Sequence, residues 1–238
     1  MKNLSPKWPW IFLIGSLLLS ACAYRLYSGP LKPLPEDRQE ADMKVADDGT
    51  VTYIRDRLEI SLRPMTDDEL NRQFASASKG GNLSTNPYTF GDWKPMGEQR
   101  TPSRFTVFRL SAKNYTYPKV LIDPMKMRLV AKNGRKYRPL SPSELKEHYY
   151  PFAIGYAGNA YSRFEARKDI LQRTLYTGDF IFSGQSREGY IVFPSLHNDV
   201  RQITVYLDDI VLRYDTFNRP IETLDIAFQF RQEVFREQ

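Results

Sequence analysis

Apolar and polar residues alternate along most of the chain, in two blocks separated by a stretch of different periodicity. An apolar residue at every second position is typical of a strand with one buried face. The clearest strand runs over residues 222–234, and its expected buried face consists of Leu224, Ile226, Phe228 and Phe230. About seven strands are predicted in this way, at roughly 51–62, 105–110, 127–137, 189–194, 202–206, 210–214 and 222–234.

Between the two blocks, residues 141–175 change to helical periodicity. Ser141 precedes Pro142 and lies three residues before Glu144, which is the capping-box pattern of a helix start. One face of a later helix then recurs at intervals of three and four residues, at Tyr161, Phe164, Lys168, Leu171 and Leu175. The pattern predicts a mainly β protein, an antiparallel β-sandwich over residues 49–238 with a helical insertion at 141–175.

The segment before the first strand has a different composition. Residues 22–48 contain three prolines and are dominated by charged side chains. Proline-rich, charged segments stay extended and bury little apolar surface. We therefore expect residues 22–48 to be a tether.

Residues 1–21 have the layout of a secretory signal peptide. Lys2 and Lys7 provide positive charge without an acid, an almost wholly apolar run covers residues 8–19, and two small residues follow. That run is shorter than the roughly 20 residues that span a bilayer. A signal helix that is removed is therefore favoured over an anchor helix that is never cut.

Leu19, Ser20, Ala21 and Cys22 resemble a lipobox, the cleavage motif of bacterial lipoprotein signal peptides. The resemblance implies cleavage before Cys22, lipid on its sulfur and a further acyl chain such as palmitate on its nitrogen. Two or more chains anchor a protein stably to a membrane. Because Ala23 follows instead of Asp, the resemblance also implies the cell outer membrane, facing the periplasm.

A second resemblance covers about residues 105–234. The strand motifs Phe105-x-Val107 with Asn114, Met127-x-Leu129 with Gly134 and Tyr137, and Gly189-x-Ile191-x-Phe193 are similar to those of bacterial immunoglobulin-like lipoprotein domains of unknown function. This family implies an immunoglobulin-like β-sandwich and no catalysis. The chain departs from the family in its helical stretch at 141–175.

Charge and reactive residues narrow the functional classes. The net charge of +6 falls to +4 without the signal, which holds two lysines and no acid, and no long run of like charge occurs. We therefore expect no nucleic-acid partner. The chain has one cysteine and two histidines, His148 and His197, in different predicted elements. The usual zinc ligand set is therefore missing.

We expect no catalytic residue, metal or cofactor, and thus no enzyme. Ser195 lies near His197 but lacks a nucleophile motif, so a polar turn is the better interpretation. The acidic pairs at 47–48, 67–68 and 208–209 lack the spacing of a calcium loop. The pair at 67–68 fits a helix start after Thr66, where negative charge is favourable.

Aromatic residues in predicted loops remain as candidates for a binding surface. They are Tyr88, Phe90, Trp93, Tyr149, Tyr150, Phe152 and Tyr156. Tyrosine and tryptophan are enriched at interfaces, but loops that fold back over the edges of the sheets would bury the same residues. We favour this second interpretation, because an exposed aromatic cluster is a liability unless it is used.

Two functions follow from different classes. The first is a membrane-anchored, non-enzymatic envelope lipoprotein whose domain binds another envelope protein or serves a structural or assembly role. The second is a glycan- or peptidoglycan-binding module in which loop aromatics stack on sugar rings.

Overall fold

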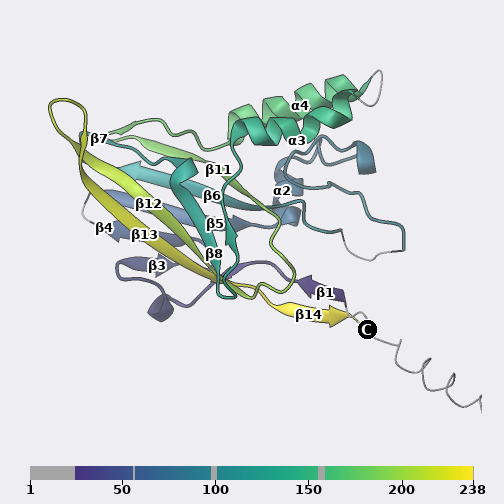
Figure 1. Ribbon diagram of the computed structural model, residues 1–238, viewed down its shortest axis with the longest axis horizontal. Coiled ribbons are helices and arrows are strands. Elements are labelled where there is room, and N and C mark those ends of the chain that lie inside the picture. Colours follow the sequence, from purple (N-terminus) through teal and green to yellow (C-terminus); the bar gives the residue numbers. More distant parts are fainter. Residues whose placement is uncertain (1–24, 56, 98–100, 155–158, 238) are drawn as a thin grey trace, which may run out of the picture.

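The computed structural model describes residues 25–237, apart from residues 56, 98–100 and 155–158. Within these residues the protein is mainly β, with antiparallel sheets and three α-helices (Figure 1). The lipobox-like residues 19–22 lie outside the described residues. Among the helices in the described part, none has the length and apolar character needed to cross a membrane.

Two five-stranded antiparallel sheets form the body of the protein. The first has the order β11-β6-β5-β4-β3, with β3 (Met43–Val45), β4 (Val51–Arg55), β5 (Leu58–Met65), β6 (Phe105–Asn114) and β11 (Ser186–Pro194). The second has the order β2-β13-β12-β8-β9, with β2 (Lys32–Pro33), β8 (Met127–Ala131), β9 (Lys136–Tyr137), β12 (Gln202–Tyr214) and β13 (Pro220–Arg231). Two further pairs are β1 (Arg25–Ser28) with β14 (Val234–Glu237), and β7 (Lys119–Val120) with β10 (Ile181–Phe182).

The apolar faces of the two large sheets share one core. Successive side chains of a strand point to opposite faces, so Phe108 and Leu110 of β6 lie on the face that is buried with Val205 and Phe228 of the second sheet. The buried face predicted for β13 is confirmed: three of its four residues are buried, and Leu224 is partly buried against the same core.

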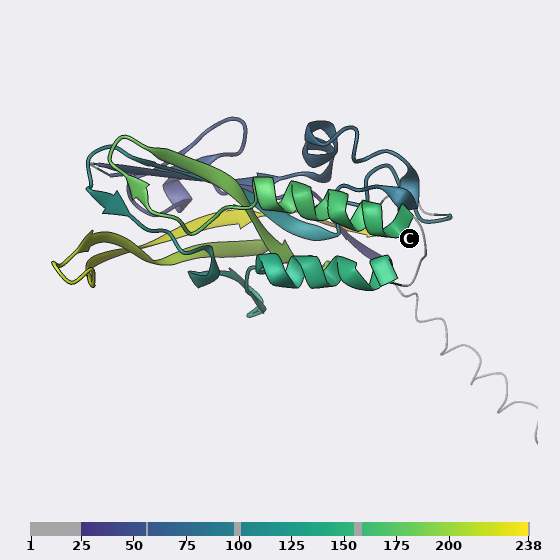
Figure 2. The same ribbon diagram turned by 90° about the horizontal axis from the view of Figure 1, so that it is seen from above.

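A second core covers the outer face of the first sheet. Phe105 and Val107, on the opposite face of β6, are buried together with Tyr190 and Val192 of β11. The helices α2 (Asp67–Gln73), α3 (Pro142–Ile154) and α4 (Asn159–Thr174) contribute Leu70, Leu145, Tyr149, Phe164 and Leu171 to this cover, and the loop before β6 contributes Tyr88. Figure 2 shows α3 and α4 lying side by side.

The predicted helix starts are confirmed. Ser141 Oγ accepts from the Glu144 backbone N–H at 3.2 Å, and the Glu144 carboxylate accepts from the Ser141 N–H at 2.9 Å. Thr66 and Glu69 form the same reciprocal pair at the start of α2. Three-residue 3₁₀ helices lie at Glu36–Arg38, Gly81–Leu83 and Pro124–Lys126.

The chain after α4 crosses β11 at very close range. The Tyr176 N–H donates to the Tyr190 carbonyl at 2.9 Å. A Cβ added to Gly189 would lie 2.5 Å from the Tyr176 nitrogen. Glycine at this position therefore permits the approach, and φ of Gly189 is not in the left-handed region.

Our expectation of a tether at residues 22–48 is wrong for the described part of that segment, residues 25–48. Met43 pairs with Tyr53, Pro33 pairs with Phe230, and β1 pairs with β14. Leu34 is buried, and the Gln39 side chain donates to the Gln229 carbonyl at 2.8 Å. Proline is tolerated on edge strands because it needs no ladder donor there, so proline content did not indicate the absence of pairing.

The two segments predicted at 202–206 and 210–214 form the single strand β12. Its register with β13 shifts between Leu207 and Ile210, and Asp209 has φ of 56°. The acidic pair at 208–209 thus occupies a β-bulge.

Candidate functional site

Of the five candidate aromatic residues whose side chains the structure describes, two are buried. The Tyr88 hydroxyl lies 2.5 Å from Thr174 Oγ1 of α4, and its ring lies 5.1 Å from that of Tyr190. Tyr149 donates to the Pro87 carbonyl at 2.6 Å. Burial raises the pKa of both tyrosine hydroxyls. Both residues pack the loop before β6 against the helices. Tyr88 fits the expectation of a loop that folds back, whereas Tyr149 lies in α3 and not in the predicted loop.

Two arginines are packed among these rings. The Arg104 guanidinium lies 4.1 Å from the centre of the Phe90 ring and donates to the Tyr149 hydroxyl at 3.0 Å. Arg167 is buried, lies 5.1 Å from the Tyr149 ring and donates to the Ser84 carbonyl at 2.6 Å. Burial, aided by Arg104, lowers the pKa of Arg167. Cation–π contacts of this kind stabilise the layer.

The remaining candidates differ in exposure. Phe90 and Trp93 are partly exposed, and their ring centres lie 5.3 Å apart with the ring planes tilted by 47°, while Tyr150 of α3 is 50% exposed. Phe152 belongs to α3, but its side chain is not described, and Tyr156 lies outside the described residues. Of the five candidates whose side chains the structure describes, two are buried and three are at least partly exposed, so these five do not form one exposed surface.

The histidines and acidic pairs are separate from one another. The rings of His148 and Phe105 contact edge to face, with their centres 5.2 Å apart. Burial lowers the pKa of His148, and the nearby Arg104 and Arg167 lower it further. His197 Nδ1 lies 2.7 Å from Asp199 Oδ1. Within the described part of the chain, no three metal-ligating side chains come together.

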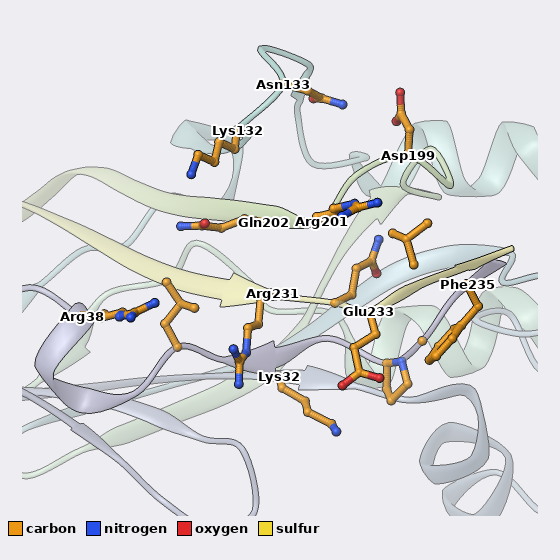
Figure 3. A pocket seen from close by; sticks show the side chains of 15 residues that line it. Lys32, Arg38, Lys132, Asn133, Asp199, Arg201, Gln202, Arg231, Glu233 and Phe235 are labelled. Atoms are coloured by element: carbon orange, nitrogen blue, oxygen red, sulfur yellow. The ribbon is translucent and has the colours of Figure 1, made fainter. Parts of the chain in front are cut away.

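A cleft of about 950 Å³ opens where the ends of several strands meet (Figure 3). It lies between the β1–β14 pair, the start of β12, the end of β13 and the hairpin that follows β8. Five cationic side chains line it, from four separate stretches of the chain: Lys32, Arg38, Lys132, Arg201 and Arg231. Asp199 and Glu233 are the acidic residues of the lining.

Strand register explains why the cations meet. Lys32 lies directly opposite Arg231 in the β2–β13 pair, and Arg231 lies opposite Gln202 in the β12–β13 pair. Arg201 immediately precedes Gln202, and the Gln232 N–H donates to the Arg201 carbonyl at 2.8 Å. The pairing of distant strands thus brings together charges that are nearly 200 positions apart in the sequence.

A smaller groove of about 610 Å³ runs beside the helices. Leu171 and Leu175 form one wall, and Pro124 and Met125 form the other. Lys146 and Lys168 also line it, and Met125 is 42% exposed. Its lining is thus apolar with positive charge alongside.

Neither the cleft nor the groove was predicted from the sequence. Their lining residues lie far apart along the chain and follow no common spacing. The only local signal was the density of lysine and arginine near the ends of predicted strands, which ordinary solvated surfaces share.

Neither a scan against protein-family models nor a search of curated proteins gives a match. Among solved structures, the protein is similar to the yjhA protein of Bacillus subtilis, with TM-score 0.35 and 11% identity, over 77% of this chain and 96% of the other. The secreted protein MPT63 of Mycobacterium tuberculosis gives 0.31 and 11%, over 69% and 90%. A functionally unknown protein of Listeria monocytogenes EGD-e gives 0.35 and 9%, over 88% of each chain. With TM-scores below 0.5, the description of the fold rests on the strand pairing itself.

Proposed function

We propose that the protein is a non-enzymatic lipoprotein of the cell envelope, anchored through lipid on Cys22, whose domain binds another envelope protein. The anchor is supported by the motif Leu19-Ser20-Ala21-Cys22 after an apolar run. We further propose that the two large sheets form an immunoglobulin-like sandwich. Their shared core and their antiparallel order support this assignment.

The groove beside α3 and α4 carries the proposal of a protein partner. Its walls expose Met125 to solvent beside Leu171 and Leu175, in a concave site. Apolar grooves next to helices accept an apolar side chain or segment of a partner. Lys168 is paired with Glu165 at 3.0 Å, and Asp123 also lines the groove. Lys146 is thus the lysine of the lining that suits an acidic residue of a partner segment.

Site-specific crosslinking tests this proposal. A photoreactive residue at Gln172, which is exposed and lines the groove, should form a discrete adduct in the bacterial cell. The same group at the neighbouring Arg173, which is exposed but does not line the groove, should form much less of it. Met125→Glu should abolish the adduct at position 172. Equal adducts at 172 and 173, or one that survives Met125→Glu, would overturn the proposal.

Labelling tests the anchor independently. Cells fed an alkyne fatty acid should label the parent chain and leave Cys22→Ser unlabelled. A parent chain that carries no label, or a label that persists in Cys22→Ser, would remove the lipoprotein proposal without touching the groove.

A further inference from the structure

The cleft at the β1–β14 end carries an excess of positive charge without internal partners. Five cations face two carboxylates. Among the residues that the structure describes, none of the five cations forms an ion pair, whereas twelve other pairs do occur there. All five side chains are exposed, so their charge reaches the solvent in the cleft.

The two acids do little to offset this charge. Asp199 accepts from Arg135 Nη2 at 3.1 Å and lies 2.7 Å from His197 Nδ1. The hydrogen bond from Arg135 lowers the pKa of Asp199, so this carboxylate is already committed to other partners. Glu233 is therefore the one acid of the lining that is left to balance the cations.

Strand pairing holds like charges against each other. Lys32 and Arg231 are directly opposed in an antiparallel pair, an arrangement that is unfavourable without an intervening anion. Arg201 lies beside the strand position paired with Arg231. A multiply charged anion between Lys32 and Arg231 would turn their repulsion into attraction, and Arg201 lines the same cleft.

The donors favour a phosphate. Three of the five cations are arginines, whose planar guanidinium groups match phosphate oxygens in a bidentate manner. Phe235, which is 47% exposed, and Pro30 give the same cleft an apolar side. A ligand with a phosphate and an attached apolar part fits both features.

The position of the cleft selects the source of that phosphate. Gly29, in the lining, lies seven residues after Cys22, a reach of at most about 25 Å. Lipid on Cys22 would therefore hold the cleft within reach of the headgroup layer. This step, and the orientation on the bilayer that follows from it, rest on the anchor proposed above.

We propose that the cleft formed by Lys32, Arg201 and Arg231 binds the headgroup of an anionic phospholipid. The bound headgroup fixes the orientation of the domain on the bilayer, so that one defined face points away from it. The lipid on Cys22 attaches the domain to the membrane, and headgroup binding in the cleft determines which face of the domain points toward the bilayer.

Calorimetry with short-chain lipids tests this proposal on the full chain in uncharged detergent. Dihexanoyl-phosphatidylglycerol should bind, and dihexanoyl-phosphatidylcholine should bind about tenfold more weakly, because its choline cation offsets the phosphate. The double variant Arg201→Gln/Arg231→Gln should lose about tenfold in affinity for phosphatidylglycerol. The matched control Lys44→Gln/Lys79→Gln removes the same charge at exposed sites outside the cleft and should stay within about twofold of the parent.

Each other outcome counts against the proposal. No binding of phosphatidylglycerol, equal binding of phosphatidylcholine or an equal loss in the control variant would overturn it. Inorganic phosphate that binds as tightly as phosphatidylglycerol would identify a free phosphate as the ligand and overturn the headgroup. Urea unfolding of both double variants verifies that each is folded.

The experiment separates this proposal from the anchor. Short-chain lipid needs no acyl chain on the protein, so Cys22→Ser should bind it like the parent. Labelled Cys22 without lipid binding would remove the cleft proposal and leave the anchor. Lipid binding without label at Cys22 would remove the anchor proposal and leave the cleft proposal.

Discussion

The packing of a loop changes the pKa of an individual side chain in this protein. Asp67 is the first residue of α2, and burial raises the pKa of its carboxyl to about 6, with a further contribution from Asp68. A hydrogen bond with Ser103 opposes this rise. Packing beside the loop that leads to Arg104 accounts for the raised pKa of Asp67, so no catalytic role is needed to explain it.

Asp67 predicts a pH dependence of stability. Its pKa in the folded protein lies above the value of about 4 for an unfolded chain, so the folded state binds the proton more tightly. Asp67 therefore lowers the free energy of unfolding as pH rises from about 4 to about 6. Urea unfolding measures the free energy of unfolding of Asp67→Asn and of the parent. The value for Asp67→Asn minus the value for the parent should be more positive at pH 7.5 than at pH 4.

A neighbouring variant controls for loss of charge at the helix start. Asp68→Asn removes a carboxylate at an exposed position of the same turn. An identical difference between Asp67→Asn and the parent at both pH values would contradict the expected linkage.

Gly189 gives a second residue-scale prediction. Gly189→Ala places a methyl group against the backbone of Tyr176, and overpacking of this kind costs about 1–3 kcal/mol. Gly29→Ala is the matched control, because its added Cβ meets the Phe235 ring at an ordinary 3.4 Å. Thermal unfolding of both variants measures the difference, and equal melting temperatures would show that the chain after α4 can shift away.

At the scale of elements, local chemistry explains what the sequence could predict. Capping boxes at Thr66 and Ser141 and the alternation of β13 are short-range patterns, so they can be recognised without knowing the fold. Segment 25–48 shows the limit. Its apolar residues, such as Leu34 and Met43, are isolated, and they become strand or core positions only because partners elsewhere in the chain accept them.

The start of α3 gives the prediction at this scale. Ser141→Ala removes the side chain that accepts from the Glu144 N–H, and loss of such a cap costs about 1 kcal/mol. Ser143→Ala, two residues further on and exposed, should cost much less, because the Ser143 hydroxyl contacts Ser141 Oγ at 3.2 Å rather than a backbone N–H. Urea unfolding compares them, and equal costs would mean that Glu144 alone holds the helix start.

The candidate sites also depend on long-range pairing. Tyr88 was a candidate because its loop has no strand periodicity, yet the fold places it between Phe74 and Tyr190. Conversely, no sequence pattern links Lys32 with Arg231, because only the register of β2 with β13 makes them neighbours. Neither outcome is encoded within a short window of residues.

At the scale of the whole molecule, the β1–β14 pair joins the two ends of the described chain. No residue of β1 or β14 belongs to either core within the described part. Removing residues 233–238 should therefore leave the two large sheets folded and deprive β1 of its partner. Limited trypsin digestion should then cut at Arg25 of β1 much faster than in the parent chain, while the urea midpoint changes little.

The opposite result would assign β1 and β14 a larger role. Unchanged digestion would mean that residues 25–32 are held by other contacts. A large drop in the urea midpoint would mean that the pair supports the sheets.

The pairing of the first strands with the last ones also affects the order in which contacts form during synthesis. β1 and β2 emerge first from the ribosome, but their partners β14 and β13 come last. Contacts so distant in sequence form late, because a long loop must close first. A chain cut short before residue 220 would thus leave β1 and β2 without their partners, so completion of synthesis is itself a condition for pairing these two strands.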